Sequence, residues 1–237
     1  MRATGRGVFV TGTDTGVGKT FVATALVRAL AMHGARVAGM KPVASGIVAG
    51  AACNADVAAL AAADGMTLPL RDRNPYGFAP AIAPHLAAHA AGVTIDLDVI
   101  ALACSRLRAH ADFIVAEGAG GVLVPLDADQ DMLDLAAVLG MPLLLVVGLR
   151  LGCINHALLS AQAIAARGLP LAGWIANAME GAMPHQQSNI DTIAARLGQP
   201  PLATLEHDLR ASAVSAALDN AAVGLLSCLR DDRKLTS

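Results

Sequence analysis

Short apolar runs alternate along the chain with longer stretches in which apolar residues recur every three to four positions. The short runs indicate buried strands, whereas the longer period is that of an amphipathic helix. The predicted strands cover residues 7–11, 36–41, 112–117, 142–148 and 171–177. The predicted helices cover residues 19–33, 54–63, 80–91, 96–110, 131–139, 154–167 and 185–197. This alternation predicts an α/β fold in three layers, with helices on both faces of a parallel sheet.

The pattern contains no sign of a division into separate units. The 237 residues hold neither an internal repeat nor a low-complexity linker, and this length suits one large domain with a substantial core. We therefore expect residues 1–237 to form a single α/β domain, with a polar, frayed tail after about residue 228. The Gly- and Ala-rich segment 43–53 is expected to be a loop over the site rather than a linker.

A glycine-studded loop that ends in Gly18, Lys19 and Thr20 joins the first predicted strand to the first predicted helix. In such a loop, backbone N–H groups and the helix N-terminus form a concave site for phosphate oxygens. Lys19 would reach the β- and γ-phosphates of a nucleotide, and the Thr20 hydroxyl would bind Mg²⁺. Gly12 lies one residue further back than usual, but the context favours phosphate binding over a chance glycine turn and predicts a fold similar to that of P-loop NTPases. The residues assigned to this loop are Thr15, Gly16, Val17, Gly18, Lys19 and Thr20.

Composition narrows the classes of partner. Hydrophobic residues make up 55% of the chain, charged residues 15%, and the formal net charge is −2. A chain without a basic excess is a poor candidate for nucleic-acid binding, and the apolar content fits a buried parallel sheet. The longest apolar run, 141–149, is too short to span a membrane, and the run at 8–10 is too short for a signal peptide. We expect a cytoplasmic protein that binds neither nucleic acid nor membrane.

Polar residues stand where the predicted strands end, and ligands bind beyond the carboxyl ends of the strands in an open parallel sheet. Lys41 ends the second predicted strand. Burying its charged ammonium there is costly unless anionic groups contact it. A lysine that is exposed to solvent just past the strand explains the position equally well. Glu117 heads a turn that continues with Gly118, Ala119 and Gly120. A carboxylate there is a candidate Mg²⁺ ligand. The alternative is that Glu117 accepts hydrogen bonds from the N–H groups of its own turn.

Two further residues are candidates whose position alone leaves their role open. Asp56 begins a predicted helix, where an acidic side chain is stabilising whatever its function. Asn177 ends the last predicted strand, and its amide could read the edge of an adenine base. A side chain that caps the next turn explains Asn177 more simply.

These segments together resemble the dethiobiotin synthetase family of ATP-dependent ligases. The similarity runs from the N-terminus to about residue 180. Residues 39–46, which read GMKPVASG, and residues 151–156, which read LGCINH, carry the resemblance most specifically. The other matching elements are 10–20, Asn74-Pro75-Tyr76, Pro84-His85, 117–121 and 172–177.

The resemblance implies an enzyme that uses ATP and Mg²⁺ to join CO₂ to 7,8-diaminononanoate and close a cyclic urea. The reaction would pass through a carbamate and a carbamic-phosphoric anhydride. The resemblance also implies that Thr20, Asp56 and Glu117 hold the Mg²⁺ ion and that Asp56 and residues 117–120 contact the nucleotide.

The resemblance further implies roles in substrate binding and catalysis. Lys41, together with Lys19, would stabilise the carbamate and the transferring phosphoryl group. Ser45 would contact the diamine and Asn177 would read adenine. Asn155 would help to bind the substrate carboxylate from the partner subunit of a homodimer, because residues 151–156 lie at the dimer interface in this family.

Beyond residue 201 the chain departs from the family. It reads Leu205-Glu206-His207-Asp208 where relatives often have a proline-containing loop on the adenine side. The resemblance therefore assigns no contact to the base in this segment and leaves the base preference open.

Two other classes of protein share the expected fold. A ParA/MinD-like switch ATPase would carry a signature lysine five residues before Lys19, where this chain has Asp14. It would also need a basic surface or tail for DNA or membrane. An amidotransferase-type ligase domain would need a glutaminase partner with a reactive cysteine, and Cys153 lacks the Gly-x-Cys context of such a residue.

Overall fold

The computed structural model describes residues 7–234 except for 180, 182 and 208–210; for 211, 212 and 227–234 it describes only the helical backbone. Its main sheet has six strands, all paired in parallel, in the order β2-β5-β1-β6-β7-β8. These strands are β1 (Gly7–Gly12), β2 (Val37–Met40), β5 (Phe113–Gly121), β6 (Leu143–Leu149), β7 (Leu171–Ala178) and β8 (Ala203–Leu205). A second, two-stranded parallel sheet pairs β3 (Val43–Ser45) with β4 (Tyr76–Phe78).

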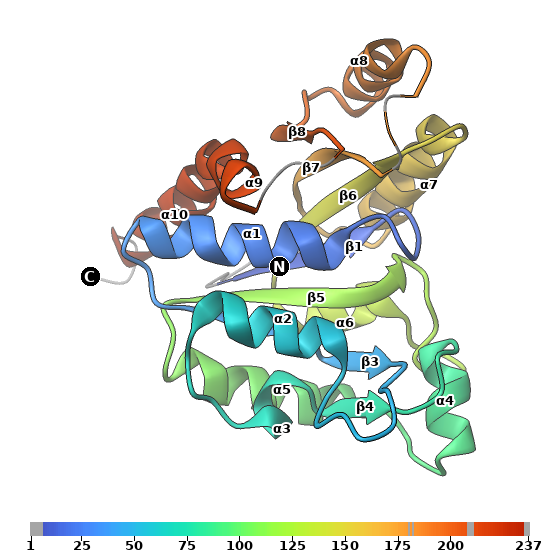
Figure 1. The fold of residues 1–237 in the computed structure, drawn as a ribbon, viewed down its shortest axis with the longest axis vertical. Helices are drawn as coiled ribbons and strands as arrows, with labels where there is room; N and C mark the ends of the chain where they lie inside the picture. The colour runs from blue at the N-terminus through green and yellow to red at the C-terminus, as the bar shows by residue number, and fades with distance from the viewer. Residues whose placement is uncertain (1–6, 180, 182, 208–210, 235–237) are drawn as a thin grey trace.

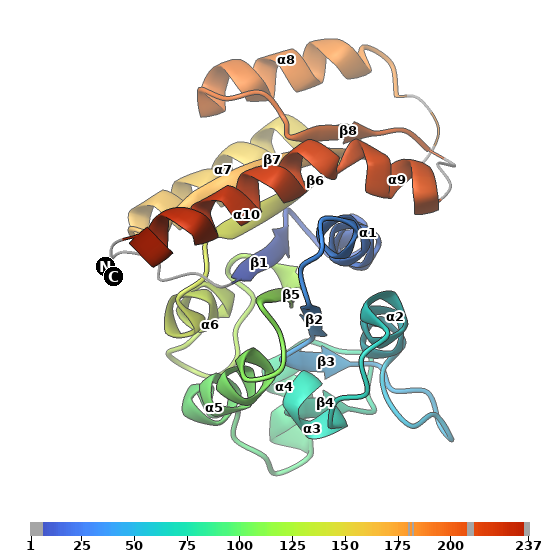
Figure 2. The ribbon, with the colours of Figure 1, turned by 90° about the vertical axis from the view of Figure 1, so that its left-hand side faces the viewer.

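Helices cover both faces of the main sheet (Figures 1 and 2). One face is covered by α1 (Lys19–Met32), α2 (Ala55–Asp64), α9 (Ala211–Ala217) and α10 (Asp219–Lys234). The other is covered by α5 (Leu97–Arg108), α6 (Met132–Leu139), α7 (Cys153–Ala166) and α8 (Gln186–Leu197). The short helices α3 (Leu70–Arg73) and α4 (Pro84–Ala90) lie near β2 and the small sheet. The predicted three-layer α/β fold is confirmed.

The strands are apolar throughout because both of their faces are buried. In β1, Val8 and Val10 pack toward the layer of α1, whereas Phe9 packs toward the opposite layer. In β6, Leu144 and Leu145 divide between the two layers in the same way. Successive side chains of a strand point to opposite faces, so a strand between two helical layers needs an apolar residue at every position. This arrangement accounts for the low share of charged residues.

Several short elements escaped the sequence patterns. Segment 43–53, predicted as a loop, begins with β3, and the missed elements β3, β4 and β8 have only three residues each. Three residues are too few to display a period. The predicted tail after residue 228 begins inside α10, which runs to Lys234, so fraying there stays a prediction. In the part of the chain that the structure describes, no helix is long and apolar enough to cross a membrane.

Candidate active site

The loop between β1 and α1 has the form expected of a phosphate-binding loop. Gly18 adopts φ 86°, a left-handed conformation that places Lys19 at the start of α1. A side chain at Gly18 would be strained, and its Cβ would collide with Asn177 Nδ2. The buried Lys19 ammonium folds back over the loop and donates a hydrogen bond to the Asp14 carbonyl at 2.7 Å. The loop therefore wraps around its own lysine, at the N-terminus of a helix.

Lys41 lies at the centre of a cluster that four separate elements bring together. Its Nζ is 2.6 Å from Glu117 Oε1 and 2.9 Å from Asp56 Oδ2, and it donates to the Gly118 carbonyl at 3.2 Å. The Thr20 hydroxyl donates to the same Glu117 oxygen at 2.7 Å. Lys41 is only 4% exposed, so of the two interpretations of this lysine, the buried one with anionic partners is correct. Asp56, whose role could not be decided from its position in the sequence, belongs to the same cluster.

Glu117 does not begin a turn, as the sequence suggested, but lies within β5. It pairs in register with Val10 of β1, and the next matched pair is Gly12 with Gly121, so β5 bulges between these positions. Bulges of this kind re-aim side chains next to active sites. The glycines of the bulge let the strand continue beside the phosphate loop, where a regular strand would have ended.

The cluster offers oxygen ligands that suit Mg²⁺. Glu117 is 1% exposed, and its Oε2 is buried with no hydrogen-bond partner among the described residues. A buried carboxylate oxygen without a partner is costly. Thr20 and Asp56 add a hydroxyl and a second carboxylate. Mg²⁺ takes one or two carboxylates and completes its shell with water and substrate phosphates. In the described ranges, no three His, Cys, Asp or Glu side chains gather to hold a metal.

The two lysines differ in their electrostatic surroundings. Burial alone would lower the pKa of Lys41, but the carboxylates of Glu117 and Asp56 raise it above its ordinary value. Burial, together with the nearby charge of Lys41, lowers the pKa of Lys19 to about 8. Burial opposes ionisation of Asp56, yet the ammonium of Lys41 and the hydrogen bond that it donates hold the pKa of that carboxyl below its usual range. Lys41 is therefore paired with carboxylates, whereas among the described residues Lys19 bonds to a backbone carbonyl and forms no ion pair of its own.

A cavity of about 830 Å³ opens beside this cluster. Lys19, Lys41, Asp56 and Glu117 line its polar end, and Ser45 contributes a buried hydroxyl that has no hydrogen-bond partner among the described residues. The apolar part of the wall comes from Phe21, residues 81–84, Val124 and Met179. An apolar wall with a few converging polar groups is typical of a site for a small organic substrate.

Asn177 holds the phosphate loop. Its buried amide Nδ2 donates to the Val17 carbonyl at 2.9 Å and lies 3.0 Å from Met179 Sδ. This amide therefore bonds the phosphate loop rather than capping the next turn, a contact between residues 160 positions apart that no sequence pattern indicates. That Asn177 reads adenine stays a prediction. A smaller hollow of about 220 Å³ adjoins Asn177 and includes Glu206 and His207. Asp208, the end of the segment that departs from the family, lies outside the described residues.

Comparison with known proteins decides the family. The chain is 48% identical over 225 residues to the ATP-dependent dethiobiotin synthetase BioD of Nitrosospira multiformis, covering 94% of this chain and 99% of that protein. It is 48% identical over 204 residues to the enzyme of the same name from Aromatoleum aromaticum, covering 85% and 91% of the two chains. A family model described as an AAA domain matches residues 6–214.

The chain belongs to the dethiobiotin synthetase family. The resemblance inferred from the sequence motifs is thereby confirmed. The similarity to these relatives covers almost the whole chain, further than the motifs that ended near residue 180.

Solved structures resemble this chain in fold. The MinC:MinD cell division protein complex of Aquifex aeolicus matches with a TM-score of 0.59 and 15% identity, covering 93% of this chain and 96% of that chain. A ParA family ATPase from Chlorobium tepidum matches with a TM-score of 0.53 and 16% identity, covering 95% of both chains. Identities this low show a shared fold alone. Asp14, which lies five residues before Lys19, pairs its carboxylate with Arg150.

Asn155 is not brought to the cavity of its own chain. It lies in the first turn of α7 and is exposed, and it does not line the cavity beside Lys41. Leu151, just before this helix, is 96% exposed. Segment 151–156 therefore exposes Leu151 and Asn155 to solvent, whereas Cys153 is buried in the core.

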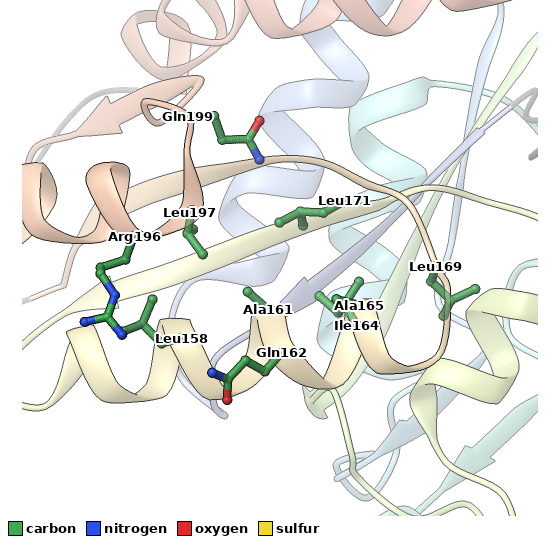
Figure 3. A pocket seen from close by; sticks show the side chains of 10 residues that line it. All are labelled: Leu158, Ala161, Gln162, Ile164, Ala165, Leu169, Leu171, Arg196, Leu197 and Gln199. Atoms are coloured by element: carbon green, nitrogen blue, oxygen red, sulfur yellow. The ribbon is translucent and has the colours of Figure 1, made fainter.

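A second hollow lies elsewhere in the chain, between α7, α8 and the start of β7 (Figure 3). Its volume is about 360 Å³ and its lining is largely aliphatic, with Arg196, Gln162 and Gln199 as polar members. None of the predicted site residues lines it. The predicted residues that line a cavity of this size or larger therefore lie at the cavity of about 830 Å³.

Proposed function

We propose that this protein is a dethiobiotin synthetase that uses ATP to carboxylate 7,8-diaminononanoate with CO₂ and close the cyclic urea, releasing ADP and phosphate. One observation carries the proposal: Lys19, Lys41 and Glu117 converge near the carboxyl ends of the central strands. They lie beside a cavity large enough to hold the diamine as well as the phosphates of ATP. The 48% identity to two dethiobiotin synthetases supports the same reaction.

Lys41 and Lys19 are the proposed catalytic residues. A neutral substrate amine adds to CO₂ and gives a carbamate, whose oxygen must then approach the γ-phosphoryl group of ATP. Both groups are anions, so the reaction needs positioning and charge neutralisation more than covalent help. Each charge-assisted contact from a lysine contributes on the order of 1.5–3 kcal/mol. Lys41, which lines the cavity, is assigned to the carbamate and the transferring phosphoryl group. Lys19, which belongs to the phosphate loop, is assigned to the ATP phosphates.

Thr20, Asp56 and Glu117 are the residues proposed to hold Mg²⁺. When bound, the ion would neutralise phosphate charge during transfer. The buried, unpartnered Oε2 of Glu117 supports this assignment. The backbone of Gly118, Ala119 and Gly120 follows Glu117 along β5 and is proposed to face the nucleotide.

The cavity wall suits the diamine. Ser45 Oγ, buried and without a hydrogen-bond partner among the described side chains, is proposed to bind a polar end of this substrate. Residues 81–84 and Val124 supply apolar surface for its aliphatic chain. For the base of the nucleotide, the hollow beside Asn177 is the proposed site.

We also propose that two chains form a dimer in which Asn155 of one chain serves the cavity of the other. The exposure of Leu151 and Asn155 supports this arrangement, because a leucine this exposed gains stability from burial against a partner. Sedimentation velocity is expected to give a dimer, and Asn155→Ala is expected to raise the KM for the diamine. An active monomer would contradict both. The cytoplasmic location expected from the sequence stays a prediction.

The proposed function is tested by measuring ADP release with ATP, Mg²⁺ and bicarbonate, with and without 7,8-diaminononanoate. A dethiobiotin synthetase releases ADP only when the diamine is present, and dethiobiotin forms in equal amount. A switch ATPase would release ADP at the same rate with or without the diamine, and that result would overturn the proposal.

The pKa of Lys19 predicts that ATP binding takes up protons. Because the pKa of Lys19 is about 8 and bound phosphates favour its charged form, binding is expected to take up about half a proton per site at pH 8. At pH 7 the uptake should fall to about a tenth of a proton. Calorimetry in buffers of different ionisation enthalpy measures this uptake. Lys19→Arg is the control, since arginine stays charged; equal uptake by this variant would contradict the assignment.

A further inference from the structure

The strand that leads to Lys41 lies at the edge of the main sheet. In the order β2-β5-β1-β6-β7-β8, β2 has a neighbour on one side only. Alternate residues of a strand point their N–H and C=O groups to the same side. Gly39 and Lys41 are two residues apart and direct these groups away from β5, to the side where no strand pairs with β2.

Residues from segment 64–74 form the hydrogen bonds that a neighbouring strand would otherwise make with this side of β2. On Gly39, the N–H donates to Asp64 Oδ2 at 2.8 Å, and the C=O accepts from Arg73 Nη1 at 3.0 Å. On Lys41, the N–H donates to the Arg73 carbonyl at 2.8 Å, and the C=O accepts from Asn74 Nδ2 at 2.7 Å. All four outward groups of the two residues are thereby bonded, as they would be beside a paired strand.

The groups that make these bonds are themselves held rigidly. The Arg73 guanidinium is 3% exposed; it donates to both oxygens of the buried Asp64 carboxylate and, at 2.7 Å, to the Met66 carbonyl. A two-point Arg–carboxylate pair of this kind fixes orientation as well as distance. Asn74 is 9% exposed, and its Nδ2 also donates to the Tyr76 carbonyl at 2.9 Å.

The same contacts tie Lys41 to the wall of the cavity. Tyr76 N–H donates to the Pro42 carbonyl at 3.2 Å, and β4 continues from Tyr76 in register with β3, which ends at Ser45. The Asn74 amide therefore bridges the backbone of Lys41 to the start of the strand that supports the segment of Ser45. The Asn74-Pro75-Tyr76 motif, to which no role has been assigned, lies at this junction.

We propose that Asn74 is a positioning residue for Lys41, and that the Arg73–Asp64 ion pair supports it. This inference rests on the proposed function, in which Lys41 acts on the carbamate and the phosphoryl group. The Lys41 ammonium makes contacts of 2.6 and 2.9 Å with Glu117 and Asp56. A displacement of its backbone by about 1 Å would move the charge off the reacting groups, and errors of that size can cost about 10²-fold in rate.

The test is steady-state kinetics of Asn74→Ala in the full chain. We expect kcat to fall about 10- to 100-fold, while the KM for ATP and the affinity for ADP stay within about twofold. The reason is that Asn74 bonds the backbone of Lys41 and Tyr76 and does not line the cavity that the phosphate loop borders. Unchanged ADP affinity also shows that the variant is folded. A loss of ADP affinity as large as the loss of kcat would make Asn74 merely structural and overturn the proposal.

A double-mutant cycle with Lys41→Ala separates positioning from general support. If Asn74 acts through Lys41, Asn74→Ala costs no further activity once Lys41 is alanine. An equal further loss in that background would overturn the inference. Arg106→Gln is the matched control: it breaks the ion pair to buried Asp72, also in the α3 segment, at 2.6 Å. It does not touch residues 39–41, so kcat is expected to stay within about twofold of wild type.

The two proposals fail in different ways. A wild-type protein without diamine-dependent ADP release overturns the proposed function, and the inference falls with it. An active wild type whose Asn74→Ala variant keeps full kcat overturns the inference alone.

Discussion

Lys41→Ala is expected to lower kcat by about 10²- to 10³-fold while ATP still binds, the range seen when one preorganised group that stabilises a transition state is removed. The ammonium of Lys41 contacts Glu117 at 2.6 Å and Asp56 at 2.9 Å and lines the cavity. Without the Lys41 ammonium, the repulsion between the anionic carbamate and the anionic γ-phosphoryl group would be less well neutralised. The phosphate loop and Lys19 remain, so nucleotide affinity should change little.

Two measurements separate chemistry from folding in this variant. Rates of dethiobiotin formation at saturating diamine give kcat, and calorimetric titration with ADP gives nucleotide affinity. Removing the one cation between two carboxylates also destabilises the fold, since breaking a buried pair costs about 3–5 kcal/mol, so the melting temperature should fall. Turnover at the wild-type rate would remove Lys41 from the mechanism.

The local parts of the fold and site could be predicted from the sequence. The first strand, the phosphate loop and α1 follow one another along the chain. The spacing of the glycines and Lys19 is enough to predict the conformation of this loop. The long strands β6 and β7 are apolar at nearly every position because both faces are buried. Where residues that are close in the sequence are also close in the structure, residue type and spacing are enough to predict the local structure.

Contacts between distant segments could not be predicted. Lys41 was equally consistent with a solvated and a buried site, because its partners Glu117 and Asp56 lie on other elements. Likewise, nothing in the sequence pattern indicates that Asn177 reaches back to Val17, or that Asn74 bonds the Lys41 carbonyl. In each case a polar side chain satisfies a backbone group that the sheet or loop leaves unpaired. Buried backbone N–H and C=O groups almost always have a hydrogen-bond partner in folded proteins. Which side chain provides that bond depends on the tertiary structure.

Glu117 illustrates the same limit at a single residue. The glycines that follow it suggested a turn, yet β5 continues to Gly121 through a bulge. Glycine favours turns because it tolerates unusual backbone angles, and a bulge beside an active site uses the same property. The distinction depends on whether β1 is there to pair with the segment, which no local pattern reports.

Glu117→Gln is expected to raise the Mg²⁺ concentration needed for half-maximal activity by about 10- to 100-fold, since changes around a metal ligand typically cost that much. It should also lower kcat at saturating Mg²⁺. Glutamine keeps the shape of the side chain and can still accept from the Thr20 hydroxyl, but it carries no charge for the metal or for Lys41. Its amide would also place N–H donors where Glu117 has acceptor oxygens.

The measurement is diamine-dependent ADP release at fixed ATP over a range of Mg²⁺ concentrations. Asp131→Asn is the matched control, because Asp131 is also a largely buried carboxylate, paired with Arg167 at 2.7 Å at the start of α6, away from the cavity. That variant should lose stability without changing the Mg²⁺ requirement. If Glu117→Gln left both the Mg²⁺ requirement and kcat unchanged, the unpartnered Oε2 would have no part in holding the metal. The catalytic charge would then rest on the two lysines alone.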